Sequence, residues 1–227
     1  MNSYQRVPRH LLAIDCIIFG FDGEDLKGLF VKRNLEPQKG NWSLMGGFVS
    51  ETESVDAAAE RVLYELTGLT DVYMEQLHCY GELERDTQSR VISVAYFALI
   101  QIANYKDEVL KEHNASWISL KELPELIFDH TQMLQDAKER LKQKVANHPI
   151  GFELLPEKFT LRQLQTLYEA IYETTLDKRN FTRKIFSLNI IKNTGKKEKT
   201  SSRKGSFYFV FEEEKYKQLE KEGLKFI

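Results

Sequence analysis

Charged residues and glycines recur at fixed intervals in residues 47–69, and their types could support metal-dependent chemistry. The spaced residues are Gly47, Glu53, Arg61, Leu63, Glu65, Gly68 and Leu69. Apolar side chains in residues 54–67 recur at helical spacing, and Gly68 stands just past them as a candidate C-cap. Carboxylates on one face of such a helix could hold Mg²⁺ against a diphosphate, because this ion needs oxygen ligands.

The segment resembles the Nudix box, whose pattern is G-x5-E-x7-R-E-U-x-E-E-x-G-U, with U an aliphatic residue. In an active box, glutamates stand at the positions occupied here by Val62, Glu65 and Leu66. Valine and leucine supply no metal ligand, and Glu65 can instead pair with Arg61 one helical turn earlier. We therefore expect a Nudix scaffold without a metal, a cofactor or catalytic residues. The alternative is a pyrophosphohydrolase acting on ADP-ribose or a nucleoside diphosphate sugar, with a shifted metal site that adds carboxylates from residues 82, 84 or 86.

A second group of chemically informative residues is basic and lies toward the C-terminal end. Apolar spacing predicts helices over residues 161–174 and 178–188, and Asp177 is a candidate N-cap for the second helix. The outward face of the second helix carries Lys178, Arg179, Asn180, Thr182 and Arg183. In the major groove, arginine suits guanine and asparagine suits adenine, so this helix is a candidate for reading bases.

A charged β-hairpin is predicted after these two helices. Residues 192–205 form a basic stretch before an apolar strand over residues 206–211. The stretch carries Lys196, Lys197, Lys199, Arg203 and Lys204. Two helices followed by such a hairpin are typical of a winged helix-turn-helix, whose wing lies along DNA phosphates. The alternative is a solvated basic face, on an adaptor that senses a nucleotide and binds protein rather than DNA.

The elements that position the first group of residues belong to a mixed sheet with helices. Strand patterns over residues 10–21 and 25–33 flank an Asp22-Gly23 turn and predict a hairpin. Further strands are predicted within residues 42–49, 72–83, 90–102 and 115–118, and a helix over residues 132–145. The predicted fold class is α+β: an α/β/α sandwich with a mixed sheet, followed by a winged helix-turn-helix.

Charge divides the chain into two parts. The net charge is −2, but residues 150–227 carry +5 and the residues before them carry −7. Such a change of sign suggests two domains, one of which meets a polyanion. The predicted domains are an effector-binding domain over residues 1–147 and a DNA-binding domain over residues 156–227. The connector over residues 147–156 contains two of the five prolines and is the expected joint between them.

Composition excludes several other classes of protein. The chain has 227 residues, of which 42% are hydrophobic and 29% charged, which is typical of a folded globular protein. No apolar window reaches the ~18 residues of a membrane helix, so no membrane partner is expected. Cys16 and Cys79 lie in strand-like runs without metal-ligand spacing and are expected to be buried free thiols. These features predict a cytoplasmic protein and exclude a disulfide scaffold, a zinc finger and a secreted domain.

The degenerate box together with the basic tail resembles the Nudix-related transcriptional regulators over nearly the whole chain. The resemblance implies an effector-binding Nudix domain joined to a winged helix, working as a homodimer on palindromic double-stranded operators. Some members sense ADP-ribose or related nucleotides, and others sense sugars such as arabinose. The missing carboxylates argue against metal-diphosphate binding, so the sequence favours a sugar-sensing member of this family.

Candidate effector-binding residues are polar or aromatic side chains near the predicted cleft. They are Asp15, Arg33, Trp42, Phe48, Glu65 and Arg90. Aromatic faces and charged hydrogen-bonding groups suit both sugars and nucleotides. Asp15 interrupts an apolar strand and could instead be a structural partner for Arg33 or Arg90, since an unpaired buried carboxylate is costly. Trp42 could equally be a core residue, and His130 could hydrogen-bond a ligand or have a helix-capping or packing role.

Overall fold

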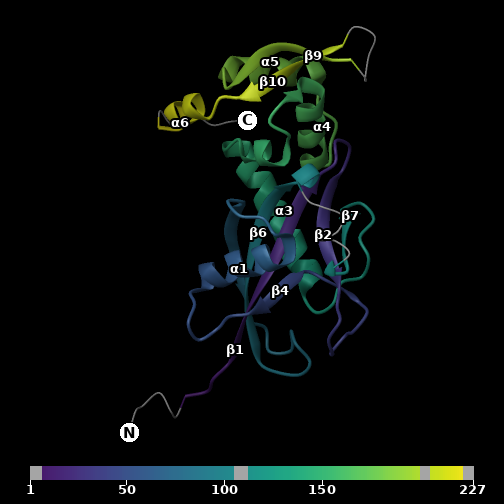
Figure 1. The fold of residues 1–227 in the computed structure, drawn as a ribbon, viewed down its shortest axis with the longest axis vertical. Helices are drawn as coiled ribbons and strands as arrows, with labels where there is room; N and C mark the ends of the chain where they lie inside the picture. The colour runs from purple at the N-terminus through teal and green to yellow at the C-terminus, as the bar shows by residue number, and fades with distance from the viewer. Residues whose placement is uncertain (1–6, 105–111, 200–204, 222–227) are drawn as a thin grey trace.

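The computed structural model describes residues 7–104, 112–199 and 205–221. The N-terminal part contains a seven-stranded mixed sheet of order β3-β2-β1-β6-β5, with β4 paired to β1 and β7 paired to β2 (Figure 1). Its strands are β1 (Leu11–Phe21), β2 (Leu26–Lys32), β3 (Trp42–Ser43), β4 (Met45–Phe48), β5 (Tyr73–Tyr80), β6 (Val91–Gln101) and β7 (Ala115–Ser119). The short helix η2 (Ile102–Asn104) follows β6. The predicted hairpin is confirmed, because β1 and β2 pair antiparallel across the turn.

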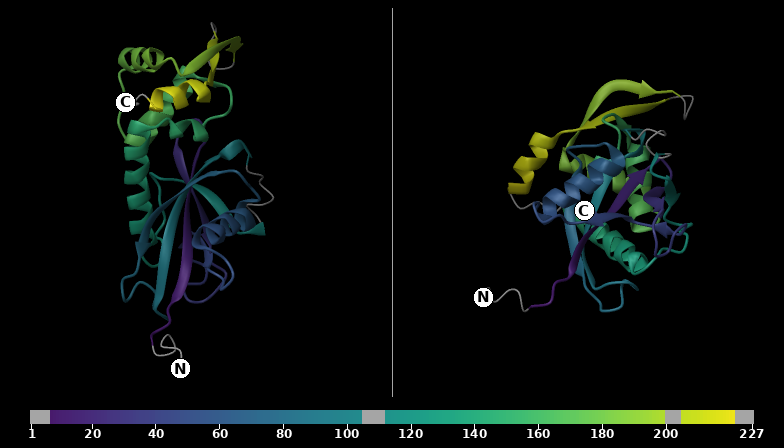
Figure 2. Two further views of the ribbon diagram at one scale, coloured as in Figure 1. Left: turned by 90° about the vertical axis from the view of Figure 1, so that its left-hand side faces the viewer. Right: turned by 60° about the horizontal axis from the view of Figure 1, so that its bottom comes forward.

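Strand β1 is central, and both of its faces are covered by a helix. It pairs in parallel with β6 from Leu11 opposite Val91 to Phe21 opposite Gln101. Helix α1 (Val55–Thr67) packs on the face that carries Ile14, Cys16 and Ile18. Helix α3 (His130–Asn147) covers the opposite face and runs along the sheet to the C-terminal part (Figure 2). The predicted sandwich of helix, sheet and helix is therefore confirmed.

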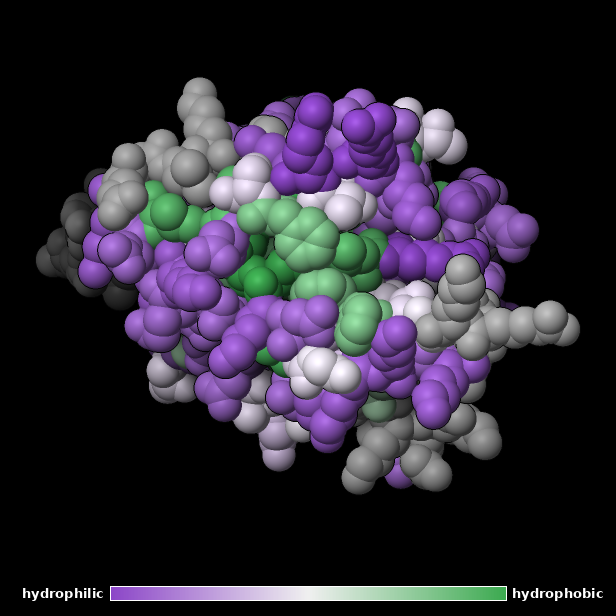
Figure 3. Space-filling view, turned by 90° about the horizontal axis from the view of Figure 1, so that it is seen from above, coloured by the Kyte–Doolittle hydropathy of each residue, from purple (hydrophilic) through white to green (hydrophobic). Residues whose placement is uncertain are grey.

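The C-terminal part is the predicted winged helix-turn-helix. Its elements are η3 (Ile150–Leu154), β8 (Phe159–Thr160), α4 (Leu161–Tyr172), α5 (Lys178–Leu188), β9 (Ile191–Glu198), β10 (Ser206–Phe211) and α6 (Glu213–Lys221). The strands form one sheet of order β8-β10-β9. Asp177 caps α5 as predicted, since its carboxylate accepts the backbone N–H of Asn180 at 2.8 Å. Seen from above, this part presents a patch of apolar side chains within a ring of hydrophilic ones (Figure 3).

One apolar cluster passes from the sheet into the winged helix. It contains Phe19 and Leu141 on one side and Tyr168 and Phe209 on the other. The connector, which was expected to be a joint, contributes buried side chains to this cluster. Phe152 of η3 is buried and stacks on Phe211 of β10, with ring centroids 4.4 Å apart. The connector is thus a packed part of the core, and the sequence analysis predicted neither η3 nor β8.

Two further findings concern cysteine burial and membrane segments. Cys16 is buried, as expected, whereas Cys79 is exposed, which corrects the prediction that both thiols are buried. The reason is that β5 pairs with β6 on one side only and has a register shift between Gln76 and His78. Within the described residues, no helix combines the length and hydropathy that crossing a membrane requires.

Candidate functional site

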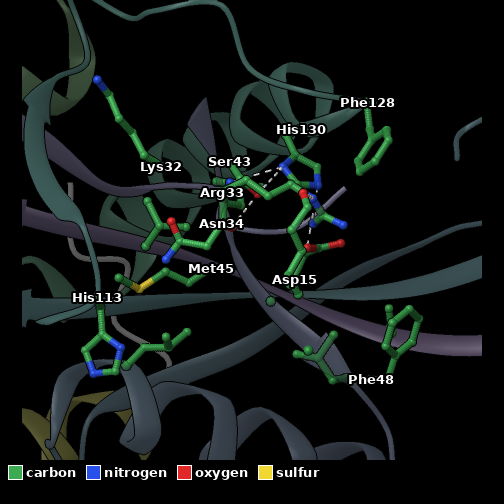
Figure 4. A pocket seen from close by; sticks show the side chains of 18 of the residues that line it. Asp15, Lys32, Arg33, Asn34, Ser43, Met45, Phe48, His113, Phe128 and His130 are labelled. Carbon is green, nitrogen blue, oxygen red and sulfur yellow. Dashed lines mark hydrogen bonds and ion pairs between the residues drawn. The ribbon is translucent and has the colours of Figure 1, made fainter. Parts of the chain in front are cut away.

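A cavity of about 420 Å³ opens between the start of β1, the end of β2, the β3–β4 region and the N-terminal end of α3 (Figure 4). Its volume lies within the range of small-molecule sites. Its charged and aromatic lining comprises Asp15, Lys32, Arg33, Phe48, Arg85, Asp86, Glu112, His113, Phe128 and His130. The rest of the lining is made of Asn34, Ser43, two glycines and apolar side chains, including Leu66 of α1. The cavity therefore combines hydrogen-bonding groups of both charges with an apolar surface.

A buried ionic cluster forms the polar wall of the cavity. Arg85 pairs with Asp129 through two hydrogen bonds, from Nε at 2.9 Å and from Nη2 at 2.8 Å. Its Nη2 also lies 3.5 Å from Oδ2 of Asp15, which accepts the hydroxyl of Ser93 at 2.6 Å. Asp15 is thus paired with Arg85, and the expectation of Arg33 or Arg90 as its partner is wrong. The loop between β5 and β6 carries Arg85 back over the sheet, whereas Arg90 donates to the carbonyl of Glu82.

His130, the first residue of α3, is locked in this wall. Its side chain is buried, and burial lowers the pKa of the imidazole, so the ring is neutral near pH 7. Nδ1 accepts the backbone N–H of Leu44 at 3.1 Å, which leaves the ring hydrogen on Nε2. Nε2 faces Oδ1 of Asp15 at 3.6 Å. The start of α3 is therefore part of the cavity and not merely adjacent to it.

Arg33 and Phe128 form an edge of the cavity. Nε of Arg33 donates to the carbonyls of Leu35 at 3.0 Å and Pro37 at 2.7 Å, and its guanidinium lies 5.7 Å from the centre of the Phe128 ring. Phe128 has a φ of 51°, a left-handed conformation that is uncommon for a bulky residue. Such backbone strain is often found at ligand sites. Phe128 and Arg85 also border a second, open hollow beside residues 82–84.

Apolar side chains occupy two of the three helix positions where an active Nudix box carries glutamates. Val62 is buried beneath the box loop, where a Cβ on Gly47 would lie 3.0 Å from its Cγ2. Leu66 lines the cavity, and Glu65 does not. The described residues contain no group of three histidine, cysteine or acidic side chains that could hold a metal ion. The donor set at this helix therefore does not fit Mg²⁺.

The retained charges of the box brace its loop against α1. Arg61 donates from Nε to Oε2 of Glu53 at 2.9 Å and from Nη2 to Oε1 at 2.7 Å. Nη2 also donates to the carbonyl of Phe48 at 3.0 Å, and Nη1 lies 3.2 Å from Glu65, which is the predicted pairing. The hydrogen bonds from Arg61, followed by that from the Ser50 amide, lower the pKa of Glu53 to about 2.

Three of the six candidate effector residues, Asp15, Arg33 and Phe48, line the cavity. Glu65 and Arg90 do not, and neither does Trp42, which packs against the core beneath the Lys32 ammonium at 5.1 Å. Five other lining residues were not predicted from the sequence as ligand contacts: Lys32, Asn34, Arg85, His113 and Phe128. Arg85 lies in a polar loop without periodicity, so no local pattern distinguishes it from its neighbours.

The second candidate surface lies on the winged helix. Lys178, Arg179, Asn180 and Arg183 are exposed on α5, and Thr182 is half-buried. They lie opposite the buried stripe of Phe181, Ile185 and Leu188. Lys196 and Lys197 are exposed on β9, and Lys199 is exposed just after it. Arg203 and Lys204 lie outside the described residues. This arrangement fits a helix in a major groove with a basic wing beside it.

Comparisons with known proteins agree with this architecture. Residues 9–138 match the model of the NUDIX domain, and residues 151–211 match the model of the NrtR DNA-binding winged helix domain. A curated relative from Acinetobacter baylyi, named ADPR responsive transcriptional repressor NtrR, is 33% identical over 92% of this chain and 86% of its own length.

Two solved structures from Shewanella oneidensis are also similar. NrtR complexed with a 27mer DNA has a TM-score of 0.80 and 29% identity, covering 91% of this chain and 95% of that one. The NUDIX domain of NrtR complexed with ADP ribose has a TM-score of 0.51 and 34% identity, covering 60% of this chain and 92% of that one.

The fold and these matches define a transcriptional regulator built from a Nudix domain and a DNA-binding winged helix. The chain belongs to the NrtR family.

The brace between Glu53 and Arg61 predicts a pH-dependent stability. Because the folded-state pKa of Glu53 is about 2 and a free glutamate titrates near ~4.3, its contribution is complete above ~4.3 and is lost as the pH falls toward 2. We expect Glu53→Gln to lower the free energy of unfolding at pH 7, and this deficit to shrink below pH 4. Urea unfolding across this range measures the effect, with Glu60→Gln, an exposed glutamate of α1, as control. A deficit that stays constant with pH would contradict it.

Proposed function

We propose that this chain is a transcriptional repressor that binds operator DNA through α5 and its wing and responds to ADP-ribose or a closely related nucleotide in the cavity. The observation that carries the proposal is the pairing of an intact Nudix cavity with apolar residues at its metal positions, in a chain that ends in a basic winged helix. Relatives named for an ADP-ribose response and for a DNA complex support it. We also propose that the protein acts as a homodimer on palindromic sites, since pairing doubles the base contacts.

The chemistry of the cavity favours a nucleotide over a simple sugar. Arg33 and Arg85 are cations that suit a diphosphate, and Phe48 and Phe128 are aromatic faces that suit a base. Asp15 and the neutral His130 suit ribose hydroxyls. The missing metal ligands favour a sugar such as arabinose instead, and this remains the second candidate effector.

We further propose that the Nudix domain binds its effector without hydrolysing it. Hydrolysis of a diphosphate by this fold needs carboxylates on α1 to hold a cation, and Val62 and Leu66 cannot do so. Of the carboxylates that could form a shifted site, only Asp86 lines the cavity, while Glu82 and Glu84 border the neighbouring hollow.

Helix α3 supports a route from the cavity to the DNA-binding surface. Its N-terminal end carries His130, which lines the cavity, and the cap residue Asp129, which pairs with Arg85 of the cavity wall. Farther along α3, Lys138 Nζ lies 2.7 Å and Lys142 Nζ 3.2 Å from the carboxylate of Glu173. Glu173 is the C-cap of α4, in the turn that leads to α5. A ligand that moves the start of α3 therefore acts on the turn of the helix-turn-helix through two ion pairs.

The DNA-binding role predicts two kinds of variant. Arg183→Ala should relax sequence preference and weaken operator binding by about 1–3 kcal/mol, because arginine on α5 reads bases. Lys197→Ala should weaken binding to every sequence and reduce the salt dependence by about one unit of slope, because a wing lysine contacts phosphate. Binding to a selected operator and to scrambled duplex, measured over a salt series, separates the two. Unchanged affinity and slope in both variants would favour the adaptor hypothesis.

The effector proposal predicts binding without turnover. ADP-ribose at 100 times its Kd should stabilise the protein by about 2.7 kcal/mol, whereas arabinose should not raise the melting temperature. Arg33→Ala should reduce the shift caused by ADP-ribose, and Lys27→Ala, away from the cavity, is the control. Incubation with ADP-ribose and Mg²⁺ should release no AMP. A shift with arabinose alone would establish the second candidate, and steady release of AMP would establish the enzyme.

The route through α3 predicts that coupling can be weakened without loss of either binding site. Glu173→Gln removes both ion pairs to α3 and leaves the basic face of α5 and the cavity intact. Its operator affinity without effector should stay close to wild type, while the fold-change that ADP-ribose causes in operator Kd should fall severalfold. Glu157→Gln, another exposed glutamate of the same domain, is the matched control. An unaltered effector response in Glu173→Gln would show that coupling takes another path.

A further inference from the structure

A large aromatic side chain lies on the outward stripe of α5 among the basic residues. Phe186 is 48% exposed and follows Arg179 and Arg183 at helical intervals of four and then three residues. At 100° per residue, the three side chains fall within an arc of about 60° on the helix surface. Phe186 therefore points to the same side as the arginines and away from the buried stripe of α5.

The ring of Phe186 is positioned by the wing. It meets the ring of Phe209 in β10 edge to face, with centroids 5.8 Å apart. Phe209 is itself buried, so it fixes one side of the Phe186 ring and leaves the other open. The face of the winged helix seen in Figure 3 carries an apolar patch within hydrophilic surroundings, and Phe186 and Phe207 are the exposed large apolar residues described in this domain.

The positive charge around Phe186 indicates which kind of partner can cover this side chain. Residues 177–204 contain ten basic and two acidic residues. Exposed lysines on both neighbouring elements include Lys184 on α5 and Lys192 on β9. A second copy of the same face would bring cations against cations, which disfavours a contact between two copies here. A polyanion with apolar groups in its groove meets no such penalty, and duplex DNA has this chemistry.

We propose that Phe186 packs against the 5-methyl group of a thymine in the major groove, next to the base pair that Arg183 reads. The inference rests on the proposed DNA binding and adds a specificity contact to it. Phenylalanine is suited to the thymine methyl group, which is the apolar feature of the major groove. Three residues along a helix advance about 4.5 Å, close to the ~3.4 Å rise of one base pair. Arg183 and Phe186 can therefore read adjacent positions.

The proposal is tested by removing the methyl group from the DNA and leaving the protein unchanged. A duplex is first selected from a random pool with the full-length protein, and each thymine is then replaced in turn by deoxyuridine. We expect one replacement per half-site to weaken binding about fourfold, the effect of one buried methyl group. In Phe186→Ala the same replacement should have no effect. Since phenylalanine carries no charge, the salt slope should equal that of wild type.

Controls separate a base contact from a packing role. Phe207→Ala removes the other exposed phenylalanine and should retain the wild-type response to deoxyuridine. Phe186→Leu keeps an apolar side chain against Phe209 and should retain part of the response, and thermal unfolding confirms that each variant is folded.

The outcomes that would contradict the proposal can be told apart by what is measured. Selection of no duplex by the wild type contradicts the proposed function itself. A deoxyuridine effect of the same size in Phe186→Ala, or no effect in any duplex that wild type binds, overturns the base contact. Dissociation of a dimer by Phe186→Ala with the deoxyuridine effect intact would assign this residue to a contact between copies.

Discussion

A buried arginine holds the start of α3 against the centre of the sheet. Arg85 is 8% exposed and stands between Asp129, the cap residue of α3, and Asp15 of β1. Without the guanidinium, two carboxylates would face each other in a site shielded from water, and breaking a buried pair of this kind costs about 3–5 kcal/mol. The direction of α3, and with it the position of the winged helix, follows from this cluster. The cluster also contributes Asp15 and Arg85 to the cavity wall, so the same ions maintain the fold and line the cavity.

The Nudix box shows how a helix can keep its structural contacts although two of its three metal-binding glutamate positions carry other residues. Glu53 and Arg61 still connect the loop to α1, and Gly68 still ends the helix in a left-handed conformation with φ of 69°. Two of the three positions that would ligate a metal are apolar, and Val62 fills the space under Gly47. The loop beside the cavity is therefore held in place by side-chain contacts with α1.

Local signals explain which features could be predicted from the sequence. Helix α1 has its apolar stripe and glycine cap, and α5 has Asp177 as its N-cap, so short-range patterns were sufficient. Arg85 could not be assigned to Asp15, because the contact spans 70 residues and depends on the path of a loop. Trp42 and Asp15 are both single departures from a strand pattern, and the sequence does not reveal which of the two faces the cavity. The prolines of the connector suggested a joint between domains, whereas its side chains Phe152 and Leu154 are buried in the core.

The continuous apolar core has a consequence for how the regulator can move. A pair of domains joined by an exposed linker can swing apart through backbone rotation at a few residues. Here Phe152 lies between Phe159 and Phe211, and a wide opening would expose that aromatic stack to water. The motion compatible with this packed connection is shear, in which packed elements slide by small amounts and side chains settle into alternative rotamers. A small displacement at the cavity would then reach the DNA-binding surface as a small change in the position and tilt of α5.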